Sequence, residues 1–126
     1  MKQMESKLLG RFGEATAAAA YRKRGYKVLQ TNYRCRYGEI DLILEKNGTV
    51  VFCEVKLRRD AAFAAAREWV DAAKQEKIIK TALFWMAGVR GRECPARFDV
   101  AEIYAPEGLA TARPAVNIIP GAFESK

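Results

Sequence analysis

Histidine is missing from all 126 residues of this chain. Its absence excludes Ser-His-Asp and Cys-His nucleophilic catalysis and the zinc sites that use imidazole. Cysteine is scarce, and Cys35, Cys53 and Cys94 are an odd number without C-x-x-C spacing. This pattern argues against a disulfide framework or a zinc ribbon and favours a reducing compartment. We therefore expect any catalysis to depend on carboxylates, Lys, Arg, Tyr or a metal held by oxygen ligands.

Long uncharged runs are missing as well. The longest falls far short of the roughly 18–20 residues that cross a bilayer, and no apolar run near the N-terminus resembles the core of a signal peptide. Half of the residues are hydrophobic and 29% are charged, an ordinary balance for a globular protein. We predict one domain over residues 1–126, in the cytoplasm, with no membrane partner and no small-molecule cofactor.

Positive charge is concentrated at one end of the chain. The net charge is +7, and residues 1–36 hold nine basic and two acidic side chains, which accounts for the whole excess. Cations contact phosphates and aromatic rings stack on bases, so this mixture favours a nucleic-acid partner. The alternative is a solvated helix face beside ordinary strand tyrosines. Four of the five tyrosines are interleaved with this segment: Tyr21, Tyr26, Tyr33 and Tyr37.

Hydrophobic periodicity predicts two helices and five strands. In chain order they are a helix over 5–24, strands over 26–32, 39–46 and 49–58, a helix over 71–87, and strands over 96–104 and 115–119. Residues 60–70 are ambiguous between loop and helix. The first helix should bury a stripe of Leu8, Phe12, Ala15 and Ala19. The order α-β-β-β-α-β-β predicts an α/β fold, a mixed β-sheet flanked by helices, with a core of about 5–119 and a short C-terminal tail.

The dipeptide Asn47-Gly48 is a strong signal for a two-residue hairpin turn. In that register Asp41 lies opposite Glu54, and Lys56 follows on the same face of the strand. Two carboxylates so placed repel unless a shared proton, a cation or a divalent metal offsets them. A one-residue bulge would break the pairing. The opposite face should be core and carries six apolar residues: Ile40, Leu42, Leu44, Val51, Cys53 and Val55.

This polar patch can form a site for phosphodiester hydrolysis. The carboxylates of Asp41 and Glu54 and the backbone carbonyl of Val55 would hold Mg²⁺ or Mn²⁺, which prefer oxygen ligands. Lys56 would orient a water molecule or stabilise developing charge. The alternative is a solvated strand face on which Lys56 neutralises Glu54 and Glu39.

The same hairpin resembles a known nuclease motif. The run Gly38-Glu39-Ile40-Asp41-Leu42-Ile43, followed by Phe52-Cys53-Glu54-Val55-Lys56, is similar to the D…(E/D)-x-K signature of the PD-(D/E)XK nuclease superfamily. More closely, residues 8–124 resemble the YraN-like family of predicted bacterial endonucleases. That resemblance also includes Gly13-Glu14, Gly25-Tyr26, Asn32 with Arg34 and Arg36, Lys74-Gln75, Arg97-Phe98-Asp99 and Ala122-Phe123.

The resemblance implies a restriction-endonuclease-like fold and a metal-dependent endonuclease that hydrolyses DNA phosphodiester bonds. Branched or structured DNA is the expected substrate by analogy with Holliday-junction-resolvase-like relatives, and two strands cut at a junction would suit a homodimer. Two alternatives stay open: a non-catalytic nucleic-acid-binding module of the same fold, and a protein-interaction adaptor.

The resemblance also assigns roles to single residues. Asp41 and Glu54 would be metal ligands and Lys56 the catalytic lysine. Glu14 would add a carboxylate from the first helix, although it lies off the expected apolar stripe and would otherwise pass as solvated. Gln75 would lie near the site, or it is an ordinary polar residue of a first helical turn.

Four basic residues are candidate contacts for DNA. Arg34 and Arg36 alternate just before the Asp41 strand and could share one side as a phosphate clamp, or form a polar turn. Arg11 and Lys74 are further candidates for phosphate contacts, and Lys74 is otherwise a solvated helix residue.

Overall fold

The structure, a computed structural model, describes residues 2–59 and 70–124. The elements are α1 (Lys2–Lys23), β1 (Lys27–Cys35), β2 (Gly38–Lys46), β3 (Thr49–Arg58), α2 (Ala72–Trp85), the π-helical turn η2 (Met86–Arg90), β4 (Ala96–Tyr104), the 3₁₀ turn η3 (Gly108–Ala110) and β5 (Ala115–Phe123). The predicted element order is confirmed. The ambiguous segment 60–70 lies, except for Val70, outside the described residues.

The five strands form one mixed sheet in the order β1-β2-β3-β4-β5. Three neighbouring pairs are antiparallel, and β3 pairs with β4 in parallel. A parallel pair cannot be joined by a tight turn, so the chain leaves β3, passes through α2 and returns along β4. This crossover puts α2 against one face of the sheet and leaves the other face for α1.

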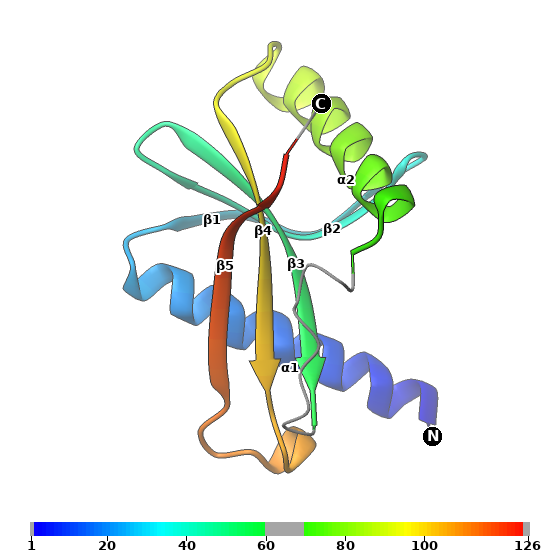
Figure 1. Cartoon of the computed structure of the whole chain (residues 1–126), viewed down its shortest axis with the longest axis vertical. Coiled ribbons are helices and arrows are strands. Elements are labelled where there is room, and N and C mark those ends of the chain that lie inside the picture. The colour runs from blue at the N-terminus through cyan, green and yellow to red at the C-terminus, as the bar shows by residue number, and fades with distance from the viewer. Residues whose placement is uncertain (1, 60–69, 125–126) are drawn as a thin grey trace.

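The two helices cover opposite faces of the twisted sheet, as Figure 1 shows for α1 crossing β3, β4 and β5 and for α2 beside β2. The core is correspondingly split into two clusters. One joins Ile78, Ala82 and Trp85 of α2 to Ile43 and Phe52 of the sheet. The second joins Ala17, Ala18 and Tyr21 of α1 to Leu42, Leu44, Val51, Cys53, Ala101 and Ile103. Within the described ranges, no helix is both long and apolar enough to cross a membrane.

The buried face of α1 differs from the prediction. Leu8, Ala15 and Ala19 are exposed and Phe12 is half-buried, whereas the helix packs on the sheet through small residues and one tyrosine. Gly13 is part of this face, since a Cβ there would lie 3.4–3.6 Å from side-chain atoms of Leu57 and Val55. Large apolar side chains attract attention in a sequence, but a helix approaches a sheet closely through its small ones. The observed stripe is Gly13, Ala17, Ala18 and Tyr21.

The hairpin register is confirmed from Lys46↔Thr49 to Leu42↔Cys53, where the β2–β3 ladder ends. The expected pairs of Asp41 with Glu54 and Glu39 with Lys56 are therefore not part of the ladder. Ile40 was expected beside Leu42 but packs in the α2-side cluster with Ile43, so the strict alternation of faces is lost at Asp41.

Two further predictions need correction. The last strand continues beyond 119 to Phe123, which stacks on Phe98 with ring centroids 5.1 Å apart, so the expected tail belongs to the core. The apolar periodicity of residues 71–87 also predicts that Leu83 faces inward with Ile78 and Ala82, but Leu83 is exposed, and Trp85 is buried in its place.

The N-terminus of α2 is fixed by a capping residue. Asp71 is extended, and its carboxylate accepts a hydrogen bond from the Lys74 N–H at 2.8 Å. Asp71→Ala is expected to lower the free energy of unfolding by about 1 kcal/mol, because one backbone donor loses its partner. Urea denaturation monitored by circular dichroism measures the change. An unchanged midpoint would contradict this role for the cap.

Candidate functional site

Two carboxyl groups meet at the point where the β2–β3 ladder ends. The side chain of Asp41 does what a backbone carbonyl does elsewhere in the sheet, since the Val55 N–H donates to Asp41 Oδ2 at 2.8 Å. The Asp41 carboxyl also hydrogen-bonds the carboxyl of Glu54. The predicted meeting of the two acids is thus correct, although it occurs through side chains beyond the last regular pair.

The pKa values of the two acids are shifted in opposite directions. Burial raises the pKa of Asp41 to about 9, with further increases from the hydrogen bond to Glu54 and from the charges of Glu54 and Glu14. Burial opposes ionisation of Glu54 too, but hydrogen bonds from Asp41 and Lys74 and the charges of Lys74 and Lys56 outweigh it and lower its pKa. Burial and the mutual repulsion of the two carboxylates thus favour one proton retained by the Asp41–Glu54 pair at neutral pH.

Two lysines complete the cluster on the α2 side. Lys74 Nζ lies 2.9 Å from Glu54 Oε2, and the Glu54 side chain is only 11% exposed. The ammonium groups of Lys56 and Lys74 lie close enough for each to affect the pKa of the other. Burial and the neighbouring Lys74 lower the pKa of Lys56, while Glu54 and Asp41 oppose the decrease. Lys56 thus stands beside both acids, as the sequence predicts, and Lys74 joins them as an ion-pair partner.

The first helix brings a third acid close to Asp41. Glu14 follows Gly13 on the sheet-facing side of α1, so it is half-buried and not solvated as its distance from the expected stripe suggested. Its Oε1 accepts a hydrogen bond from Asn32 Nδ2 at 3.0 Å, and its charge contributes to the raised pKa of Asp41. Both Glu14 and Asp41 line a hollow of about 550 Å³ beside α1.

Basic residues border the two hollows that flank the acids. Arg11 and Arg34 line the one beside α1, and Arg34 pairs with the exposed Glu39 at 2.9 Å. Lys74 lines a second hollow of about 380 Å³ beside α2, together with Glu54. Arg36 has different neighbours from Arg34, since its guanidinium lies over the rings of Tyr37 and Phe84. A clamp formed by Arg34 and Arg36 together stays a prediction.

Gln75 makes a structural contact. Its side-chain amide donates to the backbone carbonyl of Val70 at 2.7 Å and closes the segment that leads into α2. That bond matches the ordinary first-turn alternative, and a direct role of Gln75 at the acids stays a prediction.

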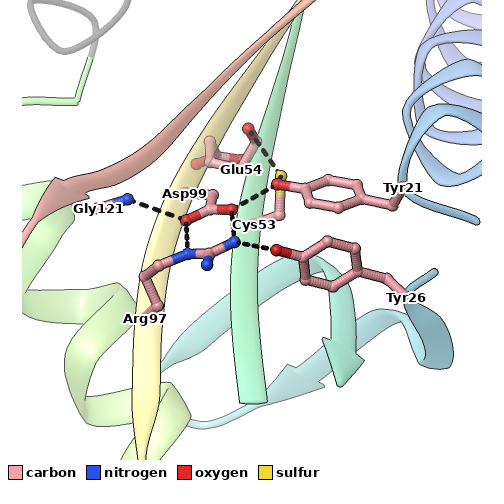
Figure 2. Close-up of polar contacts among 7 residues, drawn as sticks. All are labelled: Tyr21, Tyr26, Cys53, Glu54, Arg97, Asp99 and Gly121. Atoms are coloured by element: carbon pink, nitrogen blue, oxygen red, sulfur yellow. Dashed lines mark hydrogen bonds and ion pairs between the residues drawn. The ribbon is translucent and has the colours of Figure 1, made fainter. Parts of the chain in front are cut away.

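A buried polar network lies behind Glu54, and the alternation of Arg97 and Asp99 along β4 predicts only the pairing of these two residues. Asp99 is 0% exposed, and Figure 2 shows Tyr21, Arg97 and Gly121 converging on its carboxylate. The Tyr21 hydroxyl donates to Oδ2 at 2.7 Å, and the Gly121 N–H donates to Oδ1 at 3.0 Å. Arg97 binds both oxygens, from Nε at 2.8 Å and from Nη2 at 2.9 Å, and its Nη2 also lies 2.9 Å from the Tyr26 hydroxyl.

This network ties α1 to the strand that carries Glu54. The Tyr21 hydroxyl lies 3.5 Å from Cys53 Sγ, which in turn lies 3.6 Å from the backbone oxygen of Glu54. Burial, reinforced by Cys53 and Asp99, raises the pKa of Tyr21 far above its ordinary value. Tyr21 and the half-buried Tyr26 are therefore structural, and the expectation that Tyr21 offers a ring to bases is wrong. A tyrosine at helical spacing from Ala17 and Ala18 is the sequence signal for this role.

The donor set at the acids fits a hard divalent cation. Mg²⁺ usually takes one or two carboxylates together with waters and substrate oxygens. Among residues 2–59 and 70–124, no group of three or more acidic or cysteine side chains is arranged to hold a metal by itself. The two carboxyl groups of Asp41 and Glu54 meet the smaller requirement of Mg²⁺, and the Lys74 ammonium already pairs with Glu54 Oε2.

Comparison with known proteins places the chain in a family. The sequence profile described as Uncharacterised protein family UPF0102 matches residues 13–103. A UPF0102 protein of Caldanaerobacter subterraneus subsp. tengcongensis is 41% identical over 98% of this chain and 100% of its own length. Another from Stutzerimonas stutzeri is 45% identical over 96% of this chain and 98% of its own length. The matched region includes Glu14, Asp41, Glu54, Lys56 and Lys74, and the chain belongs to the uncharacterised protein family UPF0102.

Proposed function

We propose that this protein is a divalent-metal-dependent endonuclease that hydrolyses phosphodiester bonds in DNA. The observation that carries the proposal is the contact of Asp41 with Glu54 at the end of the β2–β3 ladder, beside Lys56 and Lys74. Two acids and two lysines in half-buried contact, in a chain without histidine, suit phosphoryl transfer better than acyl transfer.

Each side chain has a definite task in this proposal. Asp41 and Glu54, with the Val55 carbonyl, would hold Mg²⁺ or Mn²⁺, which supplies Lewis-acid stabilisation of the charge developing on the phosphoryl oxygens. Lys56 would orient the attacking water or stabilise the same charge. Lys74 would leave its ion pair with Glu54 and bind a substrate phosphate instead. Glu14 would add a third carboxylate beside Asp41.

The substrate is the finer part of the proposal. The +7 charge and the basic borders of both hollows favour a polyanion over a small phosphoester. The α-β-β-β-α-β-β order and the mixed sheet support a restriction-endonuclease-like fold. The resemblance to junction-cleaving nucleases adds branched DNA as substrate and a symmetric homodimer as the active form, which sedimentation velocity tests.

A cleavage panel tests the activity. End-labelled duplex, nicked, flapped and four-way DNA are incubated with Mg²⁺ or Mn²⁺, and we expect products that disappear with EDTA. Lys56→Met is expected to lower the cleavage rate by about 100- to 1,000-fold, because a charge that stabilises the transition state is lost. The matched control is Lys80→Met, which removes an exposed α2 lysine paired with Glu76 and should cleave like wild type.

The same panel distinguishes an endonuclease from a protein that only binds DNA. A non-catalytic binding module would bind the same DNAs with an affinity that falls steeply with salt and yield no product with either metal. The Lys74–Glu54 ion pair is the observation that favours this second candidate, because it neutralises one of the two metal ligands. Absence of cleavage on all four substrates would overturn the endonuclease proposal.

A further inference from the structure

An exposed group of aromatic and cationic side chains stands apart from the acids. Tyr37 follows the end of β1 and Phe84 lies in the last turn of α2, yet their rings meet with centroids 5.6 Å apart at an interplanar angle of 63°. The Arg36 guanidinium lies 5.0 Å from the Tyr37 centroid and 5.9 Å from that of Phe84. The hydroxyl of Tyr37 accepts a hydrogen bond from Arg36 Nη2 at 3.0 Å. We refer to Arg36, Tyr37 and Phe84 as the aromatic platform.

Exposure distinguishes the platform from the other rings of the described chain. Tyr37 is 37% and Phe84 43% exposed, and in residues 2–59 and 70–124 they are the most exposed aromatic residues. Phe52, Trp85 and Phe98 are buried in the α2-side cluster. The core is thus filled without the platform, whose two rings stay partly exposed at the surface.

The platform lies beside the hollow that leads to Glu54. Gly38 follows Tyr37 directly, lines that hollow, and approaches α2 so closely that a Cβ there would lie 3.2 Å from Thr81 Oγ1 and 3.7 Å from Lys77 Cβ. Lys74 and Lys77 line the same hollow. A path from Glu54 to the platform therefore follows α2 past two lysines.

The length of α2 sets the scale of this path. Ten residues separate Lys74 from Phe84, which corresponds to about 15 Å along a helix. One strand of a duplex advances about 3.4 Å per nucleotide along the helix axis, so this length corresponds to at most about four nucleotide steps, and an extended single strand covers it in fewer. A strand with a phosphate at Glu54 and Lys74 could thus place a base on the platform within about four nucleotides.

We propose that the aromatic platform stacks an unpaired base of a single-stranded DNA segment whose backbone runs along Lys77 and Lys74 to the acids. The inference rests on the proposed function for its direction, and it adds the substrate feature that the site recognises. Bases in a duplex are stacked on their neighbours and offer no free face, whereas single-stranded bases stack on protein rings. The guanidinium of Arg36 extends the platform because it is planar and stacks on bases as a ring does.

Binding measurements without metal test the platform separately from cleavage. Fluorescein-labelled single-stranded oligothymidylate and a duplex of equal length are titrated with the full-length protein in EDTA, and anisotropy is recorded. Tyr37→Ala and Phe84→Ala are each expected to weaken single-strand binding by about 5- to 100-fold, because stacking of one base is lost. Duplex affinity should change less than about twofold. Phe84→Tyr retains a ring and should bind like wild type.

The control variant removes exposed apolar surface elsewhere. Val89, in η2, is 60% exposed, and Val89→Ala should bind both DNAs like wild type. A single strand with 2-aminopurine tests stacking directly: quenching by wild type should disappear in Tyr37→Ala. The proposal is overturned if both alanine variants fold with wild-type circular dichroism and still bind the single strand at wild-type affinity, or lose duplex affinity equally.

The two proposals fail in different ways. Ring-dependent single-strand binding without cleavage in the metal panel would support the platform and overturn the endonuclease. Metal-dependent cleavage, together with single-strand binding that does not depend on Tyr37 and Phe84, would support the endonuclease and overturn the platform.

Discussion

Asp41→Asn is expected to abolish metal-dependent cleavage while making the folded protein more stable above pH 7. The loss of activity, at least about 100-fold, follows because the Asp41 carboxyl can release its proton to bind a metal, whereas the amide of Asn cannot become an anionic ligand. The amide oxygen can still accept the Val55 N–H, and the amide nitrogen can donate to Glu54 as the protonated acid does. The substitution therefore preserves the local bonding and removes the charge.

The gain in stability follows from the sign of the pKa shift. The pKa of Asp41 rises from about 4 to about 9 on folding, so the folded state holds an extra proton between these pH values. Stability contributed by this proton is complete below pH 4 and is lost as the pH rises toward 9. Glu54, with its lowered pKa, acts in the opposite sense and only in acid. The charges of Glu14, Lys56 and Lys74 face the same pair and stay in place in the variant.

Thermal unfolding at pH 5, 7 and 9 measures this effect. Wild type should lose stability across the series, and Asp41→Asn should show a flatter profile, with a melting temperature at pH 9 a few degrees above that of wild type. Glu76→Gln is the control, since it neutralises an exposed acid on α2 that pairs with Lys80 and should change neither the pH profile nor cleavage. Equal pH dependence in Asp41→Asn and wild type would refute the raised pKa of Asp41.

Asp99→Ala is expected to lower the free energy of unfolding by about 3–5 kcal/mol, the largest effect on stability that we predict. The substitution leaves the buried Tyr21 hydroxyl and the Gly121 N–H without their acceptor and removes both bonds to Arg97. The cost arises from desolvated groups left without partners, and less from the lost attraction itself.

A double substitution distinguishes this cause from simple loss of volume. Combining Asp99→Ala with Arg97→Met should cost less than the sum of the single changes, because the second removes a cation that the first leaves unpaired. Lys80→Ala, at an exposed i,i+4 pair on α2, should stay within about 0.5 kcal/mol of wild type. Urea denaturation gives all four values. A loss below about 1 kcal/mol for Asp99→Ala would show that the network contributes little.

The strands were the most predictable part of the fold. Asn47-Gly48 fixes the turn, and alternating apolar residues fix the register as far as Leu42↔Cys53. The register could not be extended to Asp41, because there a side chain accepts the Val55 N–H and ends the ladder. A side-chain carboxyl group that accepts a hydrogen bond in place of a backbone carbonyl leaves no periodic signal in the sequence.

The buried face of α1 was less predictable, because the largest apolar side chains are not the ones that face the sheet. Leu8 and Phe12 outrank Ala17 and Ala18 in hydrophobicity, yet the alanines face the sheet, since close packing favours small side chains. For the same reason Glu14 was expected to be solvated if it had no role at the site. It lies one turn before Ala17 and Ala18 and so shares their face. The candidate acids and Lys56 were predictable from the hairpin alone, whereas the pairing of Lys74 with Glu54 depends on how α2 returns over the sheet.

The topology also divides the charges of the site between two loop closures of unequal entropy. Asp41 and Glu54 are brought together by a two-residue turn, whereas Lys74 lies about twenty positions beyond Glu54 along the chain. Once the turn has formed, β2 and β3 pair residue by residue, whereas the contact of Lys74 with Glu54 needs a separate closure of about twenty residues. The hairpin alone therefore brings Asp41 and Glu54 together, and Lys74 reaches them only when α2 packs on the sheet. Before α2 packs, the two acids can stay in contact only while one of them keeps a proton.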